Sequence, residues 1–162
     1  MLAVRYVALT ALVVWLGGMV VLGVLVAPAT FQVLQASDQA NGRWLAGLLF
    51  GDVLRRFHLL AYACGIVLFV CLFIMKFVGP PPSAFILRSA IVAAMLALAL
   101  YSGVGVSGEI DRLQGQVAGR VDSLPKEDAR RVRFERLHRT STVVMAINMT
   151  LGLVLLIWYA RE

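Results

Sequence analysis

The sequence predicts an all-α integral membrane protein, in which four transmembrane helices form an antiparallel bundle with a charged helical extension between helices 3 and 4. Three observations lead to this fold class. Of the 162 residues, 60% are hydrophobic and only 15% are charged, and the mean hydropathy is +0.85. A helix that crosses a hydrocarbon core of roughly 30 Å needs about 20 apolar residues. Four windows without a charged residue meet this need, at 6–31, 59–75, 89–108 and 140–160.

The first span is expected at about 6–27. Proline removes a backbone donor and disfavours helix at the preceding residue, so we expect Pro28 to end this helix. Ala27-Pro28-Ala29 also has the small-residue pattern of a signal-peptide cleavage site. The apolar run before it is longer than the roughly 7 to 15 residues of a signal h-region, which favours an uncleaved span.

The connection to the second span contains a segment at about 43–57 in which apolar and charged residues are mixed. Such a segment is suited to lying in the membrane interface, although a loop helix packed on the bundle would have the same composition. The second span is expected at about 58–77. Glycine and three prolines follow at 79–82, and this stiff turn makes the second and third spans antiparallel neighbours.

The third span is expected at about 86–108 and is rich in small residues. Small residues four apart let membrane helices approach closely, because lipid supplies no hydrophobic drive between them. We therefore expect Ala93 and Ala97, together with Gly18 of the first span, to lie at helix contacts.

Charged sequence at about 109–137 separates the third span from the fourth, which is expected at about 138–160. The charged part is compatible with helix, so it predicts an extramembrane hairpin. A charged run of this kind is usually a solvated face, but it can also dock a partner or anionic lipid headgroups. The whole chain, 1–162, is then a single four-helix transmembrane domain.

The two histidines of the chain, His58 and His138, stand where charged sequence turns apolar. Alternate spans begin on the same side of a membrane, so both should lie at one depth. From His138 inward, Ser141 and Asn148 continue a polar stripe along one helix face, and Tyr62 lies one turn beyond His58. Polar groups in a span usually face the bundle interior.

Three interpretations of the histidines stay open. They can be interfacial residues, they can line a polar pocket for a proton, an ion or a small molecule, or they can be the axial ligands of haem b. The sequence offers no third histidine, no carboxylate at membrane depth and no spaced cysteine pair for a zinc site. We therefore predict no cofactor, and His58 and His138 are metal ligands only in the haem interpretation.

A weak internal repeat has a period of 80 residues. The sequences Leu-Arg-Arg-Phe-His at 54–58 and Phe-Glu-Arg-Leu-His at 134–138 match as apolar, any, Arg, apolar, His. The ends of the first and third spans also fall about 80 residues apart. This pattern predicts two helical hairpins of like design.

Enzyme motifs are missing from the sequence, which contains no nucleophile elbow, no H-E-x-x-H and no glycine-rich phosphate loop. Gly103-x-Gly105-x-x-Gly108 has the spacing of a dinucleotide fingerprint but follows a membrane helix and not a strand. We expect a non-enzymatic carrier, tolerance factor or accessory subunit with a polar pocket at one membrane face. The alternative is a bis-histidine haem-binding redox protein.

The expected partners are the lipid bilayer and either other membrane subunits or further copies of the chain, with no role for nucleic acid. Four of the 15 Lys and Arg residues lie before the first span, in the turn at 79–85 with its flanks, or at the C-terminus, and 11 lie in the other two connections. The positive-inside rule then places both termini outside and the charged hairpin in the cytoplasm. We expect the cell membrane to be a bacterial inner membrane.

Four short motifs occur in order along the chain: Trp15-x-Gly17-Gly18; Ala27-Pro28-x-x-Phe31-x-x-Leu34; Ala46-Gly47-x-x-Phe50, followed by Phe57-His58; and Phe134-x-x-x-His138-x-x-Ser141. In this order and spacing the sequence resembles the transmembrane-protein-205-like family, also described as domain of unknown function 4149. The third span departs from the family pattern. A proline expected beyond it is replaced around Glu109, and an asparagine expected near Met145 occurs at Asn148.

The resemblance implies a four-helix integral membrane protein whose biochemical activity is not settled. It gives Trp15, Gly17, Gly18, Pro28 and Phe31 structural roles as family-motif residues. Eukaryotic members are linked with tolerance to platinum drugs. A more distant likeness to four-helix copper-resistance and haem-dependent membrane proteins is the second source of the haem hypothesis.

Overall fold

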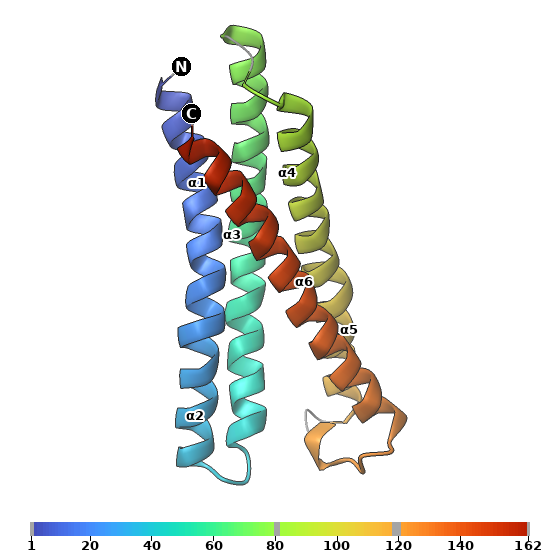
Figure 1. Cartoon of the computed structure of the whole chain (residues 1–162). Coiled ribbons are helices and arrows are strands. Elements are labelled where there is room, and N and C mark those ends of the chain that lie inside the picture. The colour runs from blue at the N-terminus through green and yellow to red at the C-terminus, as the bar shows by residue number, and fades with distance from the viewer. Residues whose placement is uncertain (1, 80–81, 118–120, 162) are drawn as a thin grey trace.

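A computed structural model describes residues 2–79, 82–117 and 121–161, which form an elongated bundle of four long helices (Figure 1). In chain order the elements are α1 (Leu2–Val20), the π-helix η1 (Val21–Val26), α2 (Ala27–Ser37), α3 (Gly42–Val78), α4 (Phe85–Leu100), the π-helix η2 (Tyr101–Val106), α5 (Ser107–Gln116), the 3-10 helix η3 (Val121–Ser123) and α6 (Ala129–Ala160). Four continuous helical stretches of 32 to 37 residues are long and apolar enough to cross a membrane. The all-α, four-span prediction is confirmed.

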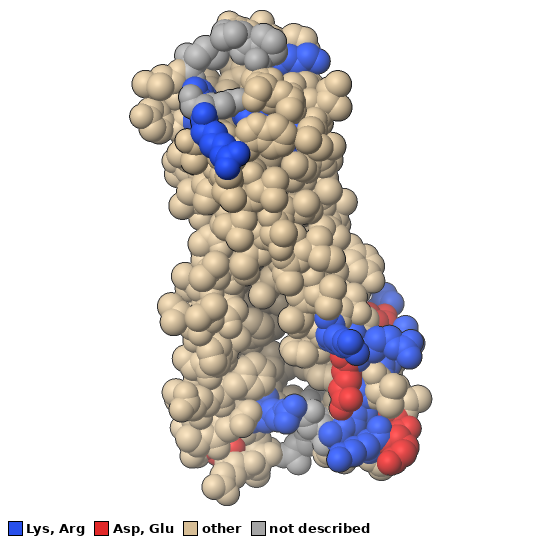
Figure 2. Space-filling model, viewed as in Figure 1, with Lys and Arg blue, Asp and Glu red and all other residues tan. Residues whose placement is uncertain are grey.

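The four long helices are arranged as a ring. α1 packs against α3 and α6, and α4 packs against the same two helices. Both chain termini lie at one end of the bundle, which we call the terminal end (Figure 1). The α2–α3 turn and the α5–α6 connection lie at the other end, which we call the charged end. Figure 2 shows acidic and basic side chains gathered there, while the middle of the visible face is uncharged.

The buried core fills the terminal half and the middle of the bundle, whereas α2 contains no buried residue. Its largest fully buried apolar side chains are Leu12, Trp15, Leu68, Leu72, Val92, Met95, Val106 and Leu155. Many other large apolar side chains are exposed on the outside of the bundle. That surface fits contact with lipid, where close van der Waals packing holds helices together in place of the hydrophobic effect.

Arg88 closes the terminal end. Its side chain is fully buried, and its guanidinium carbon lies 5.0 Å from the ring centroid of Trp158 and 5.2 Å from that of Tyr159. One guanidinium nitrogen donates to Ser83 Oγ at 3.1 Å. A guanidinium is planar and weakly hydrated, so it can stack on aromatic rings. Arg88 therefore ties the start of α4 to the last turn of α6.

Pro28 does not end the first helix, and the predicted end at residue 27 is wrong. The helix passes through the π-helix η1, where the N–H of Ala27 bonds to the carbonyl of Leu22, five residues back, and then runs on to Ser37. Proline is tolerated in the first turn of a helix, because its missing N–H has no partner to lose there. Hydrogen bonding is π-helical just before Pro28, so Pro28 lies in the first turn of the α-helix that follows, where a proline is tolerated.

The mixed segment at 43–57 is the first half of α3 and is collinear with the apolar second half. It packs lengthwise against α2, so it does not lie across the bundle in the plane of an interface. The turn before it is fixed by Asp38, whose carboxylate accepts from the backbone N–H groups of Ala40 at 2.9 Å and Asn41 at 3.0 Å. Of the two interpretations of this segment, the structure supports the helix packed on the bundle.

The two hairpins repeat one design with the predicted period. Each has a long helix interrupted by a six-residue π-helix, and η1 and η2 begin at Val21 and Tyr101, which are 80 residues apart. Buried residues of the first hairpin and of the second recur at the same spacing: Ala8, Leu12, Trp15, Met19 and Leu22 against Arg88, Val92, Met95, Ala99 and Ser102. The sequence repeat therefore corresponds to a structural one.

The expected helix contacts are confirmed at one position and wrong at two. A Cβ added at Gly18 would overlap the ring of Phe57 on α3, so Gly18 does lie at a close approach. Ala93 and Ala97 are exposed. The inward face of α4 is set by the larger side chains of the repeat, and the small residues four apart fall on the outside.

The other family-motif residues take different places. Trp15 is buried in the core, Phe31 is half-buried, and Pro28 is exposed. Gly17 is exposed, and a Cβ there would meet nothing within 4 Å. Close packing thus requires glycine at position 18 and not at position 17.

Candidate functional site: a cleft at the charged end

A cavity of about 640 Å³ lies between the two hairpins in the charged half of the bundle. There α2 packs against α3 and α5 packs against α6, and the two pairs diverge (Figure 1). Figure 2 shows the hollow between them from the side of the bundle. We call this cavity the cleft. It is lined by side chains from all four long helical stretches.

The rim of the cleft carries charges of both signs. Arg43, Asp52 and Arg55 line it from α3, and Asp111 lines it from α5. The Asp52 carboxylate bonds to Arg55 and also accepts from Arg56 Nε at 2.8 Å. With two bases and two acids among these lining residues, the rim does not select strongly for one sign of charge.

The middle of the cleft is built around His58, which is buried, with 8% of its surface exposed. Its imidazole packs on Gly103 of η2, where an added Cβ would lie 2.9 Å from His58 Cγ and would overlap the hydroxyl of Tyr62. That hydroxyl donates to the carbonyl of Ala99 at 3.3 Å. Glycine at position 103 is therefore what lets both polar side chains of α3 approach the helix opposite.

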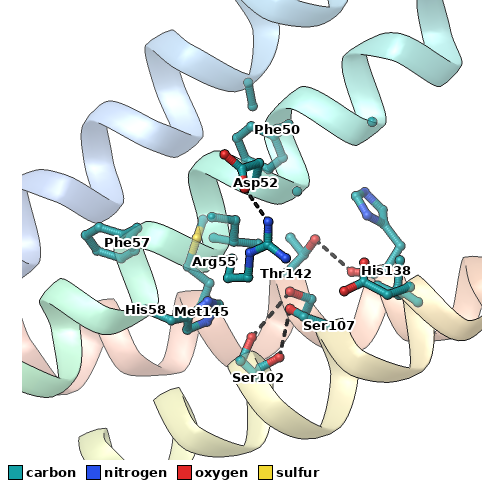
Figure 3. Close-up of a pocket in the computed structure, with 18 of the residues that line it drawn as sticks. Phe50, Asp52, Arg55, Phe57, His58, Ser102, Ser107, His138, Thr142 and Met145 are labelled. Carbon is teal, nitrogen blue, oxygen red and sulfur yellow. Dashed lines mark hydrogen bonds and ion pairs between the residues drawn. The ribbon is translucent and has the colours of Figure 1, made fainter.

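Hydroxyl groups of the second hairpin also line the cleft. Ser102 Oγ lies 3.5 Å from Ser141 Oγ, which joins η2 to α6. Ser107 Oγ donates to the carbonyl of Ser102 at 3.0 Å, and Thr142 Oγ1 donates to the carbonyl of His138 at 3.1 Å. Figure 3 shows Ser102, Ser107 and Thr142 together, with His58 and Met145 nearby.

The floor of the cleft is mainly apolar, with walls from Trp15, Met19, Ala99 and Met145. Asn148 is the polar exception and is 4% exposed. Its Nδ2 donates to the carbonyl of Met95 at 3.0 Å, which fixes the direction of the amide. Asn148 lies ten residues beyond His138, so the floor is about 15 Å deeper along α6.

Two buried polar atoms of residues that line the cleft have no hydrogen-bond partner among the described residues: Trp44 Nε1 and Asn148 Oδ1. A buried polar group left unpaired costs roughly 1–3 kcal/mol. Both residues line the cleft, and these two atoms lie within its walls and not on its surface.

The structure brings together some of the predicted site residues. His58, Ser141 and Asn148 line the cleft, and Tyr62 supports His58 from the next turn. His138 also lines it but is exposed, and Figure 3 shows its imidazole directed away from His58. Axial haem ligands must face one iron from opposite sides. This pair does not face a common point, so the two residues do not fit a haem.

Sequence reasoning missed several cleft residues. Ser102 lies near the end of a span that the sequence marks only as rich in small residues, and Trp44 lies in the mixed segment at 43–57. Gly103 stands out in the sequence only in a glycine spacing that does not fit its helical context. The signal that could have found Ser102 is the repeat, which places it 80 residues after the buried Leu22. A polar side chain at a position that the repeat marks as buried indicates a polar interior.

Metal and thiol chemistry have little support in the described ranges. No group of three or more His, Cys, Asp or Glu side chains that could hold a metal ion occurs within 2–79, 82–117 and 121–161. Cys64 and Cys71 are free thiols buried in the core of α3. They pack between helices, away from the cleft.

Comparison with known proteins gives one match. The model of a family described as "Domain of unknown function (DUF4149)" matches residues 10–118, which include most of the first span, the second and third spans, and most of the residues that line the cleft. No curated protein and no solved structure matches the chain.

Proposed function

The chain belongs to the DUF4149 family, and we propose that this multi-pass membrane protein binds an amphipathic small molecule in the cleft, as a non-enzymatic carrier or accessory subunit. The observation that supports this proposal is the composition of the cleft, an apolar floor below a polar middle and a charged rim. A molecule with one apolar and one polar part matches both regions at once.

The size of the cleft supports a small-molecule ligand. Ligand sites are typically about 300–1,000 Å³ and combine apolar walls with a few placed polar groups. The volume of about 640 Å³ and the walls from Trp15, Met19 and Met145 agree with that description. Ser102, Ser107 and Ser141, which also line the cleft, supply the polar groups.

The direction of the opening supports entry from the bilayer. Figure 2 views the bundle from the side, and the hollow is visible there between the two hairpins. An amphiphile already dissolved in one leaflet could reach the cleft without crossing water. Binding of toxic amphiphiles from the membrane would also account for a role in tolerance.

The hydroxyl groups of the cleft support binding over covalent catalysis. Ser102 pairs with Ser141, and Ser107 donates to a backbone carbonyl. A nucleophilic hydroxyl needs a general base within hydrogen-bond reach. In the described part of the cleft these hydroxyls bond to each other and to backbone, and none bonds to His58.

We place the charged end in the cytoplasm of a bacterial cell, with both termini outside. Of the four bases on the terminal side, Arg88 is buried in the bundle, so three remain at the surface there, namely Arg5, Lys76 and Arg161. The contrast with the 11 bases of the other side is therefore larger than the sequence alone indicates. A C-terminal reporter that is active only outside the cytoplasm tests this, and a reporter active only in the cytoplasm would overturn it.

The test of ligand binding uses hexadecanol with a diazirine on its chain, added to the protein in nanodiscs and activated by light. We expect labelling of cleft walls such as Met19 and Met145, which plain hexadecanol should compete away. Labelling confined to lipid-facing residues such as Val143, and not competed, would refute the proposal.

Matched glycine variants separate the cleft from the protein surface. Gly108 lines the cleft and Gly115 does not, although both lie on α5 and an added Cβ meets nothing within 4 Å at either. Gly108→Leu should reduce the competed labelling severalfold, whereas Gly115→Leu should leave it unchanged. On α3, Gly47→Leu should act like Gly108→Leu, because Gly47 also lines the cleft with its nearest neighbour at 3.9 Å.

A further inference from the structure

We propose that Arg136 and Arg139, on the outer face of α6, bind the phosphate of an anionic lipid headgroup. This site is separate from the cleft and does not depend on the function proposed for it. Three observations carry the proposal: the ion pairs of the neighbouring arginines, the difference between the two repeats, and the apolar face that α6 presents next to these residues.

The arginines around this site are already paired with carboxylates. Arg130 Nη2 lies 2.8 Å from Asp128 Oδ2, and Arg133 Nη2 lies 2.8 Å from Glu109 Oε1. Arg131 Nε lies 3.3 Å from Glu135 Oε1. This ion pair engages the acid on α6 that is nearest to Arg136 and Arg139. Arg136 and Arg139 are exposed and have no ion pair within the described ranges. Their charges are therefore the ones available to an external anion.

The repeat shows that this pair of free charges is particular to the second hairpin. Arg56 corresponds to Arg136, and its Nε lies 2.8 Å from Asp52, one turn earlier. The residue that corresponds to Asp52 is Val132, so Arg136 lacks the acid that neutralises its counterpart. Arg139 has no basic counterpart either, because the corresponding residue of the first hairpin is leucine.

The position of the two arginines matches the headgroup layer. Residues three and four apart on a helix share a face, and the face of Arg136 and Arg139 continues through Val143, Ile147 and Val154. These three are 50%, 46% and 44% exposed, so this stripe faces the acyl chains of the bilayer. Arg139 lies one turn before the stripe begins, and Arg136 one turn further out.

The chemistry of arginine suits a phosphate. A guanidinium presents its N–H groups in a planar fork that pairs with two phosphate oxygens at once. Side chains three residues apart lie roughly 5–6 Å apart at Cβ, so both guanidinium groups can reach one phosphate. A lipid meets the apolar stripe and the two charges together, whereas a free phosphate gains nothing from the stripe.

The test measures lipids retained by the protein from nanodiscs of phosphatidylcholine with phosphatidylglycerol, by native mass spectrometry. We expect the wild type to retain phosphatidylglycerol preferentially. Arg136→Gln with Arg139→Gln should bring its retention down to that of phosphatidylcholine. The matched control, Arg130→Gln with Arg133→Gln, removes the same charge from paired positions and should retain the preference. An equal loss in both double variants, or a loss in neither, would overturn the proposal.

Two further measurements make the result specific. Val132→Asp places in the second hairpin the acid that pairs with arginine in the first, so it should lower phosphatidylglycerol retention, whereas Val132→Asn should not. Inorganic phosphate at millimolar concentration should not displace the lipid. Displacement by phosphate alone would show a site for free anions and would overturn the lipid assignment.

Discussion

Gly18 of α1 lies directly under the ring of Phe57 on α3, so closely that a Cβ at position 18 would overlap the ring. Phe57 lines the cleft and precedes His58 in the chain. The contact therefore fixes the distance between α1 and α3 at the depth where His58 enters the cleft. The neighbouring Gly17 faces outward, and a Cβ added there would meet nothing within 4 Å.

Gly18→Leu should destabilise the bundle, because the added side chain has to displace an aromatic ring held between two helices. Overpacking of this kind typically costs about 1–3 kcal/mol. The measurement is thermal unfolding in detergent. Gly17→Leu is the control, since it makes the same change on the same helix in open space, and it should unfold like the wild type. Equal effects at both positions would show that the close approach of α1 and α3 is misplaced.

Gly103→Ala should disturb the cleft from the opposite side. The new methyl would overlap the Tyr62 hydroxyl and approach His58 Cγ to 2.9 Å. We expect thermal stability to fall by about 1–3 kcal/mol, together with loss of the labelling by the diazirine alcohol. Gly105→Ala is the control in the same π-helix, because its Cβ would make ordinary contacts of 3.5 and 3.8 Å with Tyr101. Full labelling of the Gly103 variant would contradict the position of His58 in the cleft.

The sequence is sufficient to predict the four helices, because 20 apolar residues without a charge have few alternatives to a span. Helix ends were harder to predict. Pro28 is a reliable signal against helix only where hydrogen bonding is α-helical, and the π-helix before it removes the conflict. The start of α6 is set by Asp128, whose side chain caps the helix.

Whether a residue of α6 faces the cleft depends on the rotation of the helix about its axis. The depth of the residue in the membrane does not give this rotation. Ser141 is seven residues before Asn148, almost two full turns, so it shares the inward face. His138 is ten residues before Asn148, which turns it roughly 80° off that face. Its position at the mouth was predictable from the span count, but its exposure was not. The 80-residue repeat could have indicated the inward face, since buried positions recur with it.

Arg88→Ala should open the terminal end of the bundle. The variant loses a guanidinium 5.0 Å from Trp158 and 5.2 Å from Tyr159, in a fully buried site. A desolvated cation–π contact is worth about 2 kcal/mol, and the empty volume adds to this loss. We expect a loss of stability above about 2 kcal/mol in detergent.

Two comparisons make the Arg88 result interpretable. Arg88→Lys should recover little stability, because an ammonium cannot stack as a flat guanidinium does. Arg161→Ala removes an exposed arginine from the same end and should change stability by less than about 0.5 kcal/mol. Full recovery by lysine would mean that charge alone, and not stacking between the two rings, is what the position requires.

The pKa of the Asp128 carboxyl should lie well below that of an ordinary aspartate. The first turn of α6 should therefore keep its cap until the pH falls to that value. Hydrogen bonds from the Arg130 side chain, and then from its backbone N–H, lower the pKa of this carboxyl from 3.8 to about 2. Asp128 Oδ1 accepts from that N–H at 2.8 Å, and Oδ2 accepts from Arg130 Nη2 at 2.8 Å. The carboxylate is therefore both the N-cap of α6 and the partner of Arg130.

The sign of the pH effect follows from this lowered pKa. The folded state binds the proton more weakly than the unfolded state, so the cap contributes fully above about pH 4 and is lost as the pH falls through about 2. Arg130→Gln should move the pKa back toward 3.8, as followed by NMR of the carboxyl carbon. Asp128→Asn should keep the cap without titrating, since asparagine caps helices as well as aspartate does. The readout is hydrogen exchange of the Arg130 amide, measured relative to an amide in the middle of α6. In the wild type this exchange should accelerate near pH 2, where the Asp128 carboxyl takes up its proton. In the Asp128→Asn variant it should show no such acceleration. A wild-type titration near 3.8 would contradict the hydrogen bonds at the start of α6.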